Sequence, residues 1–226
     1  MKSFPKVLAY ALLAGVATAC DSNPVEVSFA QPFPAGRTEV VGFAQQDQGQ
    51  YVSPNDTACT LLVSKQRLIT RRFETLKLTA TQLDSLKLSH QVGRNQWHDG
   101  QAYLVQPLAD GSFQLHWQSL DTLAEFGPAQ NTQLRRYRGW YYLSAQTDAG
   151  TWVVERLAIA NGRLHWQEFN RDSLRIKALP PKSVNLTRQK KQLFFTLNPA
   201  SGPATRQVNS YQGLWLTKAD YLRRDL

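Results

Sequence analysis

The sequence predicts a mainly β protein: an antiparallel sandwich or distorted barrel of two related half-units, with one to three short helices. Three observations predict this class. Dipeptides that favour tight hairpin turns punctuate the middle of the chain. The segments around them alternate between apolar and polar residues with the period of two that is typical of strands. Finally, two stretches of the chain resemble each other.

Composition excludes several classes of protein. The chain has 226 residues, of which 42% are hydrophobic and 11% aromatic, and this is enough apolar surface for a folded core. Two cysteines allow at most one disulfide, so the chain is not a disulfide scaffold. The one long apolar run lies at the N-terminus, which excludes a membrane protein with several spans.

Residues 1–19 have the features of a secretory signal peptide. Basic residues precede a ten-residue apolar run (7–16), which is too short to span a bilayer, and Ala17-Thr18-Ala19-Cys20 follows. Small residues before a cysteine resemble the lipobox of bacterial lipoproteins. The resemblance implies cleavage before Cys20, diacylation of its thiol and acylation of its new α-amine. The family usually has Leu or Val where Ala17 stands.

Ordinary signal peptidase offers an alternative, because Ala17-Thr18-Ala19 is also an A-x-A cleavage site. Cys20 would then be free to pair with Cys59 in an oxidising compartment. Lipidation, in contrast, leaves Cys59 as a single thiol. Its apolar surroundings (57–61) predict a small buried residue in a strand.

The charge balance points to the cell envelope. The formal net charge is +9, and the loss of Lys2 and Lys6 with the signal leaves 24 basic residues against 17 acidic ones, or +7. A basic balance can indicate a nucleic-acid partner, but an exported lipoprotein meets little nucleic acid. The expected partners are the membrane, through lipidated Cys20, and anionic envelope lipid or glycan; dispersed, solvated charge is the alternative. The choice between inner and outer membrane stays open.

The mature chain divides into a tether and a domain. Residues 20–42 contain three prolines and read as a lipid-anchored tether, although the alternating segment 25–29 is also compatible with a short strand. Residues 43–226 read as a single mainly β domain.

Hairpin signals place the strands. Asp99-Gly100, Asp110-Gly111 and Asn161-Gly162 suit type I′ turns, whose two central residues both need positive φ. The strands that flank them are expected at 93–98, 101–108, 112–118, 151–160 and 163–169.

Helical signals are shorter. Residues 79–88 and 172–179 each begin with a residue that can cap a helix and continue with spaced leucines. Residues 187–197 place apolar side chains at helical spacing opposite Arg188, Lys190 and Lys191, which predicts an amphipathic helix. Their Phe-Phe-Thr run also allows a strand. A basic face of this kind can lie on a membrane or simply be solvated.

An internal near-repeat suggests two related units, near 49–88 and 139–179. Asp-Ser-Leu occurs in both, and a Gly-aromatic pattern opens each. The alternative is coincidence among β-rich segments.

Two segments of the second unit carry a family resemblance: Gly139-Trp140-Tyr141-Tyr142-Leu143, preceded by basic residues, and Trp152-Val153-Val154-Glu155-Arg156-Leu157. They resemble the pattern Lys/Arg-x-Gly-Tyr-Tyr-x-Leu, then Trp-x-Val-x-x-Leu, of uncharacterised Bacteroidetes-type lipoproteins. The likeness extends over most of the mature chain, and its motifs are structural, so the family implies no activity. The Gly-aromatic strand openings also resemble lipocalins, although in lipocalins the motif opens the first strand.

No local motif supports catalysis or metal binding. The four histidines lack metal-ligand spacing, and the chain contains no HExxH, G-x-S-x-G or nucleotide-binding loop. The sequence therefore predicts no catalytic residue, no metal and no cofactor.

Side chains opposite two tryptophans are the candidate ligand-facing residues. In a barrel with a polar lumen, His116, His165, Gln114 and Gln167 would line it, whereas in a sandwich they would point to water.

Three functions follow from these patterns. The leading hypothesis is a lipid-anchored, non-enzymatic binding or assembly-accessory module of the bacterial cell envelope. A lipocalin-like carrier of an apolar ligand would need a closed barrel with an apolar cavity. An envelope glycan hydrolase would need two carboxylates about 5–10 Å apart in one cleft.

Overall fold

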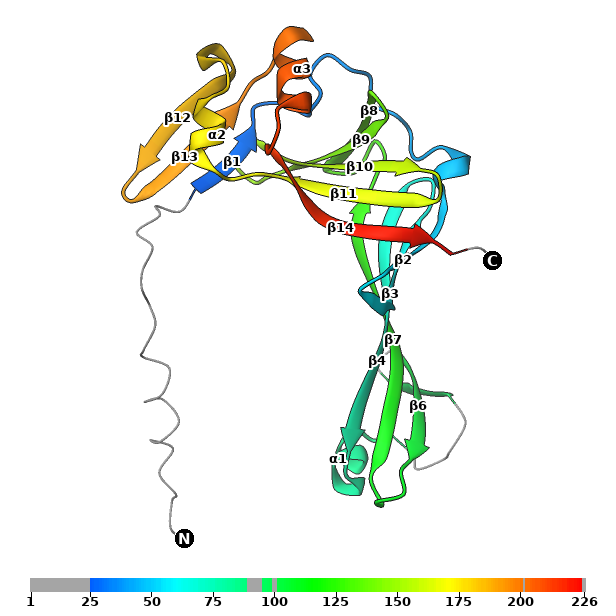
Figure 1. Cartoon of the computed structure of the whole chain (residues 1–226). Coiled ribbons are helices and arrows are strands. Elements are labelled where there is room, and N and C mark those ends of the chain that lie inside the picture. Colours follow the sequence, from blue (N-terminus) through cyan, green and yellow to red (C-terminus); the bar gives the residue numbers. More distant parts are fainter. Residues whose placement is uncertain (1–24, 89–94, 99–100, 201, 225–226) are drawn as a thin grey trace.

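Fourteen strands hydrogen-bond into one continuous, strongly bent sheet that does not close on itself (Figure 1). The computed structural model of this chain describes residues 25–88, 95–98, 101–200 and 202–224. Neighbouring strands follow the order β12-β13-β1-β10-β11-β14-β2-β3-β4-β7-β6-β5, and β9 and β8 extend from β10. Among the described strands every ladder is antiparallel except β1–β13, which is parallel. The mainly β prediction is confirmed.

Short turns connect most of the elements. The strands are β1 (Val25–Phe29), β2 (Gly49–Ser53), β3 (Asp56–Val63), β4 (Arg67–Leu78), β5 (Asn95–His98), β6 (Gln101–Pro107), β7 (Phe113–Glu125), β8 (Thr132–Tyr137), β9 (Trp140–Gln146), β10 (Trp152–Ala160), β11 (Arg163–Phe169), β12 (Val184–Gln189), β13 (Gln192–Leu197) and β14 (Trp215–Arg223). The helices of the described chain are α1 (Ala80–Ser85), α2 (Ser173–Lys177) and α3 (Gly202–Ser210), with 3-10 turns at Gln45–Asp47 and Pro181–Ser183.

Most of the sheet curls around one apolar cluster, the inner core. Its buried residues are Phe43, Tyr51, Leu61, Val63, Leu68, Ala124, Phe126, Leu134, Tyr141, Leu143, Leu157, Leu164, Trp166 and Tyr221. They come from β8 and β9 at one end of the curl and from β4 and β7 at the other. The curl corresponds to the predicted distorted barrel, and it stays open because no ladder joins β7 to β8 in the described chain.

A second cluster, the outer core, covers the other face of β9, β10, β11 and β14. Its buried residues are Phe29, Phe33, Tyr142, Val154, Phe169, Ile176, Leu179, Phe195, Leu197, Val208, Leu214 and Trp215. Successive side chains of a strand point to opposite faces, so Tyr142 enters the outer core while its neighbours Tyr141 and Leu143 enter the inner one. Strands β1, β12 and β13 and helices α2 and α3 supply the rest of this cover (Figure 1).

Strands β4 and β7 continue past the inner core and form an arm with β5, β6 and α1 (Figure 1). The arm has its own small core of Leu78, Leu83, Leu88, Val105 and Leu115. Because β4 and β7 pair over their whole length, from Arg67 opposite Glu125 to Leu78 opposite Phe113, the arm is a direct extension of the curled sheet.

Two of the predicted helices are confirmed. Thr79 caps α1 in a capping box with Gln82, and Asp172 caps α2 by accepting a hydrogen bond from the backbone N–H of Leu174 at 2.9 Å. Helix α3 was not predicted. It is only nine residues long and begins with Gly202-Pro203, the two residue types of lowest helix propensity.

The predicted helix over 187–197 is wrong. The segment belongs to the β12–β13 hairpin, and its turn contains Lys190 with a φ of +52°. Leu193, Phe195 and Leu197 alternate toward the outer core with the period of a strand. The segment follows the strand-like alternation of residues 193–197 and not the helical spacing of its apolar residues. The alternative prediction of a strand is therefore the correct one.

The hairpin predictions hold with one change of turn type. Asn161 and Gly162 both have positive φ, as a type I′ turn requires. In the loop at Asp110-Gly111 only Gly111 has positive φ, and Leu108 and Ser112 close the loop by hydrogen bonding across it at 2.7 Å. The Asp99-Gly100 turn lies outside the described residues.

The expected tether contains ordered structure. Residues 25–29 form β1, which was the alternative, and Phe29 and Phe33 are buried in the outer core. Arg135 fixes the segment beyond, since its Nη1 donates to the backbone oxygens of Pro32 at 2.7 Å and Pro34 at 2.8 Å. Residues 25–34 are therefore part of the fold; Cys20, the rest of the predicted tether before Val25 and the signal region 1–19 lie outside the described chain.

The two near-repeat segments share an order of elements. Residues 49–88 form the meander β2-β3-β4 followed by α1, and residues 139–179 form the meander β9-β10-β11 followed by α2. Cys59, in the first of these units, is a free and buried thiol, as its strand context predicted.

Phe33→Ala tests whether the segment after β1 is part of the fold. The ring lies 5.4 Å from Phe29, 5.0 Å from Tyr142 and 6.3 Å from Trp215 between centroids. Its loss should lower the free energy of unfolding by about 3–5 kcal/mol in denaturant titration. Val41→Ala, at a side chain that is 71% exposed, is the control and should change it by less than about 0.5 kcal/mol. Equal denaturation midpoints for the two variants would contradict the conclusion that the segment after β1 is part of the fold.

Candidate functional site

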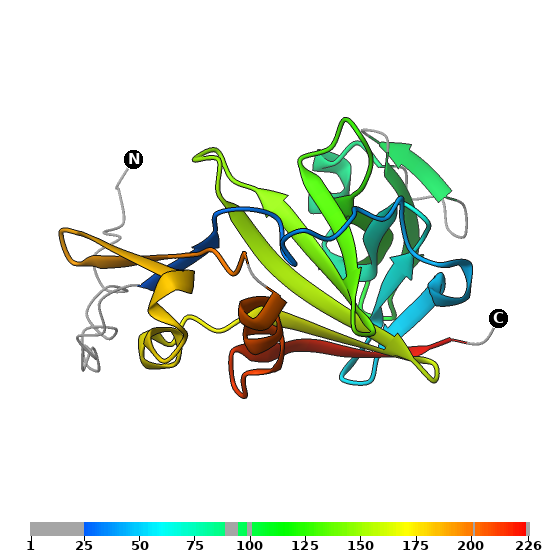
Figure 2. The ribbon, with the colours of Figure 1, turned by 90° about the horizontal axis from the view of Figure 1, so that it is seen from above.

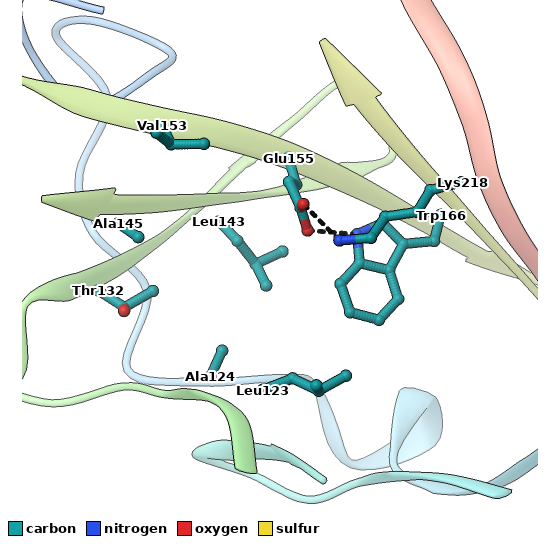
Figure 3. A pocket seen from close by; sticks show the side chains of 9 residues that line it. All are labelled: Leu123, Ala124, Thr132, Leu143, Ala145, Val153, Glu155, Trp166 and Lys218. Atoms are coloured by element: carbon teal, nitrogen blue, oxygen red, sulfur yellow. Dashed lines mark hydrogen bonds and ion pairs between the residues drawn. The ribbon is translucent and has the colours of Figure 1, made fainter. Parts of the chain in front are cut away.

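A small cleft opens at the seam where β7 and β8 do not pair (Figure 3). Its volume is about 220 Å³. The lining residues are Leu123, Ala124, Thr132, Leu143, Ala145, Val153, Glu155, Trp166 and Lys218, contributed by β7, β8, β9, β10, β11 and β14. The cleft thus occupies the gap that keeps the curled sheet from closing.

A β-bulge shapes the apolar side of the cleft. Leu123 and Ala124 are consecutive, so in a regular strand only one of them could face it. The register shifts here, because Leu68 lies opposite Ala124 while Ile69 lies opposite Thr122, and Leu123 is the extra residue. The bulge turns Leu123 to the rim, where it is 42% exposed; across the cleft, Val153 is 44% exposed.

A carboxylate, an indole and an ammonium group form the polar end (Figure 3). Glu155 accepts a hydrogen bond from Trp166 Nε1 at 2.8 Å on one oxygen and pairs with Lys218 Nζ at 2.5 Å on the other. Lys218 Nζ also lies 4.7 Å from the centroid of the Trp166 ring. Since both carboxylate oxygens are engaged, Glu155 holds Lys218 in place at the mouth of the cleft.

The size and lining favour binding of a small amphiphilic group. At about 30 Å³ per water molecule, the cleft holds the volume of about seven waters, which is below the range of pockets that enclose a whole drug-sized ligand. An aliphatic or aromatic end of a ligand can lie against Leu143 and Val153, with an anionic or hydrogen-bonding head at Lys218.

The four predicted ligand-facing residues do not gather in one site, and none of them lines this cleft. Gln114 and His116 lie on β7 in the arm, with His116 opposite Thr75 on β4 and Leu104 on β6. His116 Nε2 is buried without a hydrogen-bond partner.

His165 and Gln167 lie on β11, on the side of the outer core. His165 Nδ1 pairs with the Asp220 carboxylate, and its Nε2 lies 2.9 Å from Gln167 Nε2. Gln167 Oε1 in turn accepts from Arg156 Nε at 2.7 Å. These side chains therefore form part of a polar chain over the sheet and do not line an enclosed lumen.

Arg156 is the centre of that chain and was missed from the sequence. Its side chain is buried, with the guanidinium carbon 4.0 Å from the Trp140 ring centroid and 4.4 Å from that of Trp215. Nη1 donates to the backbone oxygen of Asn209 at 2.8 Å and to its Oδ1 at 3.1 Å. No ion pair in the described chain involves Arg156.

Burial shifts the pKa values of two side chains in this cluster, Tyr142 and Arg156. It raises the pKa of the Tyr142 hydroxyl to about 12, against a smaller opposing effect of the Arg156 charge. It also lowers the pKa of Arg156 from its ordinary value. Tyr142 donates its hydroxyl proton to Asn209 Oδ1, so the residue links β9 to α3 as Arg156 links β10 to α3.

A second hollow brings two carboxylates together but is too small for a sugar. Glu155 and Glu168 are direct cross-strand partners on β10 and β11 and line a space of about 40 Å³, close to the volume of one water molecule. The larger cleft has Glu155 as its single acidic lining residue. The geometry that the hydrolase hypothesis requires is therefore missing from both described hollows.

No protein-family model matches this chain, and neither the curated proteins nor the solved structures contain a match to it. Within the described residues, no group of three His, Cys, Asp or Glu side chains is arranged to hold a metal ion. Over the same residues, none of the helices has the length and apolar character needed to cross a membrane.

Arg156→Ala tests the buried arginine. Removal takes the Arg156 donor from Gln167 Oε1 and from the backbone oxygen of Asn209 and opens a gap between two indole rings, so the free energy of unfolding should fall by about 3–5 kcal/mol. Arg163→Ala, at an exposed residue seven positions along, should change it by less than about 0.5 kcal/mol. Chemical denaturation followed by tryptophan fluorescence measures both. Identical denaturation curves for the two variants would show that the Arg156 cluster contributes little to the stability of the fold.

Proposed function

We propose that this protein is a lipid-anchored binding module of the bacterial cell envelope, whose cleft between β7 and β8 takes a small apolar group. The cleft carries the binding half of the proposal, since it combines exposed apolar rims with a fixed ammonium group. The lipobox-like Ala17-Thr18-Ala19-Cys20 carries the anchoring half. The likeness to uncharacterised Bacteroidetes-type lipoproteins agrees with the anchoring half and supplies no activity.

The short chain between Cys20 and the fold limits how far an anchored domain could lie from the membrane. Cys20 is five residues before Val25, where β1 begins, so this segment can span at most about 18 Å. More than one acyl chain gives stable anchoring. The domain would then sit directly on the membrane surface and not at the end of a long linker.

The two other functions have less support. A lipocalin-like carrier needs a closed barrel around an apolar cavity, whereas this sheet is open and its inner core is filled with side chains. A glycan hydrolase needs a pair of carboxylates in a cleft of sufficient size, and Glu155 is already held by Trp166 and Lys218.

Cys20→Ala tests the anchor. Without the thiol there is no acyl attachment, so the protein should move from the membrane fraction to the soluble fraction of the cell. Mass spectrometry of the wild-type N-terminus should show acyl groups on Cys20, and Cys59→Ala, which leaves the lipobox intact, should stay in the membrane fraction. Unchanged membrane partition of Cys20→Ala would refute the anchor.

Binding of anilinonaphthalene sulfonate tests the cleft. Its aromatic rings suit the apolar wall and its sulfonate suits Lys218, so its fluorescence should rise on binding the native protein. Val153→Glu places a negative charge on the rim, which repels the sulfonate, and should weaken binding about tenfold, or about 1.4 kcal/mol. Val41→Glu adds the same charge at an exposed position outside the cleft and should leave the affinity unchanged. Equal affinities for the two variants would place the probe elsewhere.

A further inference from the structure

The parallel pairing of β1 with β13 determines where the chain leaves the sheet toward its N-terminus. Val25 lies beside Leu193, and Phe29 lies beside Leu197. Strand β13 begins at Gln192, directly after the turn that joins it to β12. In both ribbon views β1 begins beside the β12–β13 hairpin (Figures 1 and 2). Val25, the first residue that the structure describes, therefore lies close to the turn of this hairpin.

The tip is basic. Arg188, Lys190 and Lys191 are exposed, and residues 184–197 include no acidic side chain. No ion pair in the described chain involves these three cations. The neighbouring acidic residue of β1, Glu26, accepts a hydrogen bond from Gln192 Nε2 at 3.1 Å. One carboxylate thus stands beside three cations, which leaves a net positive surface.

The tip is also hollowed. An open depression of about 350 Å³ is lined by Gln189, Lys190, Lys191, Gln192 and Phe194. Two ammonium groups and two amides supply hydrogen-bond donors, and the ring of Phe194 supplies an apolar wall. Such a lining suits a phosphate group attached to an apolar body.

We propose that the β12–β13 tip is a second membrane contact, which binds anionic phospholipid headgroups and sets the orientation of the anchored domain. The proposal rests on the proposed anchoring at Cys20. The segment from Cys20 to Val25 spans at most about 18 Å, and charge acts over a Debye length of about 8 Å at physiological salt, so an anchored domain brings the tip within reach of the surface.

The expected strength of the contact follows from its charge. Each basic residue near an anionic membrane strengthens binding about fivefold. Three such residues should therefore strengthen membrane binding by roughly a hundredfold. This is weak next to an acyl anchor but sufficient to orient a protein that the anchor already holds. The contact should weaken steeply with added salt.

Vesicle binding of the unlipidated chain tests the tip apart from the anchor. The exported Cys20→Ala chain, cleaved at Ala17-Thr18-Ala19, is the starting protein. It should cosediment at low salt with vesicles that contain phosphatidylglycerol and not with phosphatidylcholine vesicles. Arg188→Gln, Lys190→Gln and Lys191→Gln together should reduce the partition coefficient by roughly a hundredfold.

A matched control separates the tip from net charge. Lys65→Gln, Arg163→Gln and Arg224→Gln remove the same charge at exposed positions away from the hairpin, and should reduce binding by less than about threefold. Equal losses in the two triple variants would overturn the proposal. Binding to dextran sulfate without binding to anionic vesicles would assign the tip to anionic glycan and overturn it as well.

Lysine labelling of the anchored protein tests orientation. Acylated wild-type protein is reconstituted in phosphatidylglycerol-containing or phosphatidylcholine vesicles and treated with a water-soluble amine-reactive ester. Labelling of Lys190 and Lys191 should slow severalfold on the anionic vesicles, while Lys65 reacts equally on both. Equal rates at the tip would overturn the proposal. Absence of acyl groups on the wild-type protein would instead refute the anchor, which keeps the two failures distinct.

Discussion

The alternation of side chains along β10 is the constraint on which the rest of the structure depends. Leu157 faces the inner core and Val154 faces the outer core, so this one strand is buried on both sides. It also pairs with β9, β11 and, at Trp152, β1. A shift of one residue in its register would exchange the two sets of side chains and disrupt both cores at once.

The same alternation assigns two polar residues of β10 to different tasks. Glu155 points to the inner side, where it holds Lys218 and Trp166 at the mouth of the cleft. Arg156 points to the outer side, where it ties α3 to the sheet through Asn209. Neighbours in sequence thus belong to the cleft and to a structural joint. The joint also steadies the lobe that carries β1 and the hairpin beside it, because that lobe packs on the same outer core.

Local patterns in the sequence predicted local structure well. Asn161-Gly162 specified its turn, Thr79 and Asp172 marked the starts of two helices, and Cys59 is buried as its strand context indicated. Long-range features had no such signal. The cleft joins residues of six strands, and its apolar rim depends on a bulge at Leu123 that appears only in the β4–β7 register. Likewise, nothing local to Arg156 shows that Trp140 and Trp215 enclose it, since Trp215 is 59 positions away.

Residues 187–197 show how a wrong element can retain a correct surface. The helical prediction grouped Arg188, Lys190 and Lys191 on one face, and the hairpin groups them at its tip, because a two-residue turn brings the ends of both strands together. What changed is their position in the molecule. A basic helix could have packed anywhere on the domain, whereas the parallel ladder with β1 places these charges near Val25, five residues after Cys20 in the sequence. The parallel pair is the one exception to antiparallel pairing in the described sheet, and it aligns the basic tip with the proposed anchor.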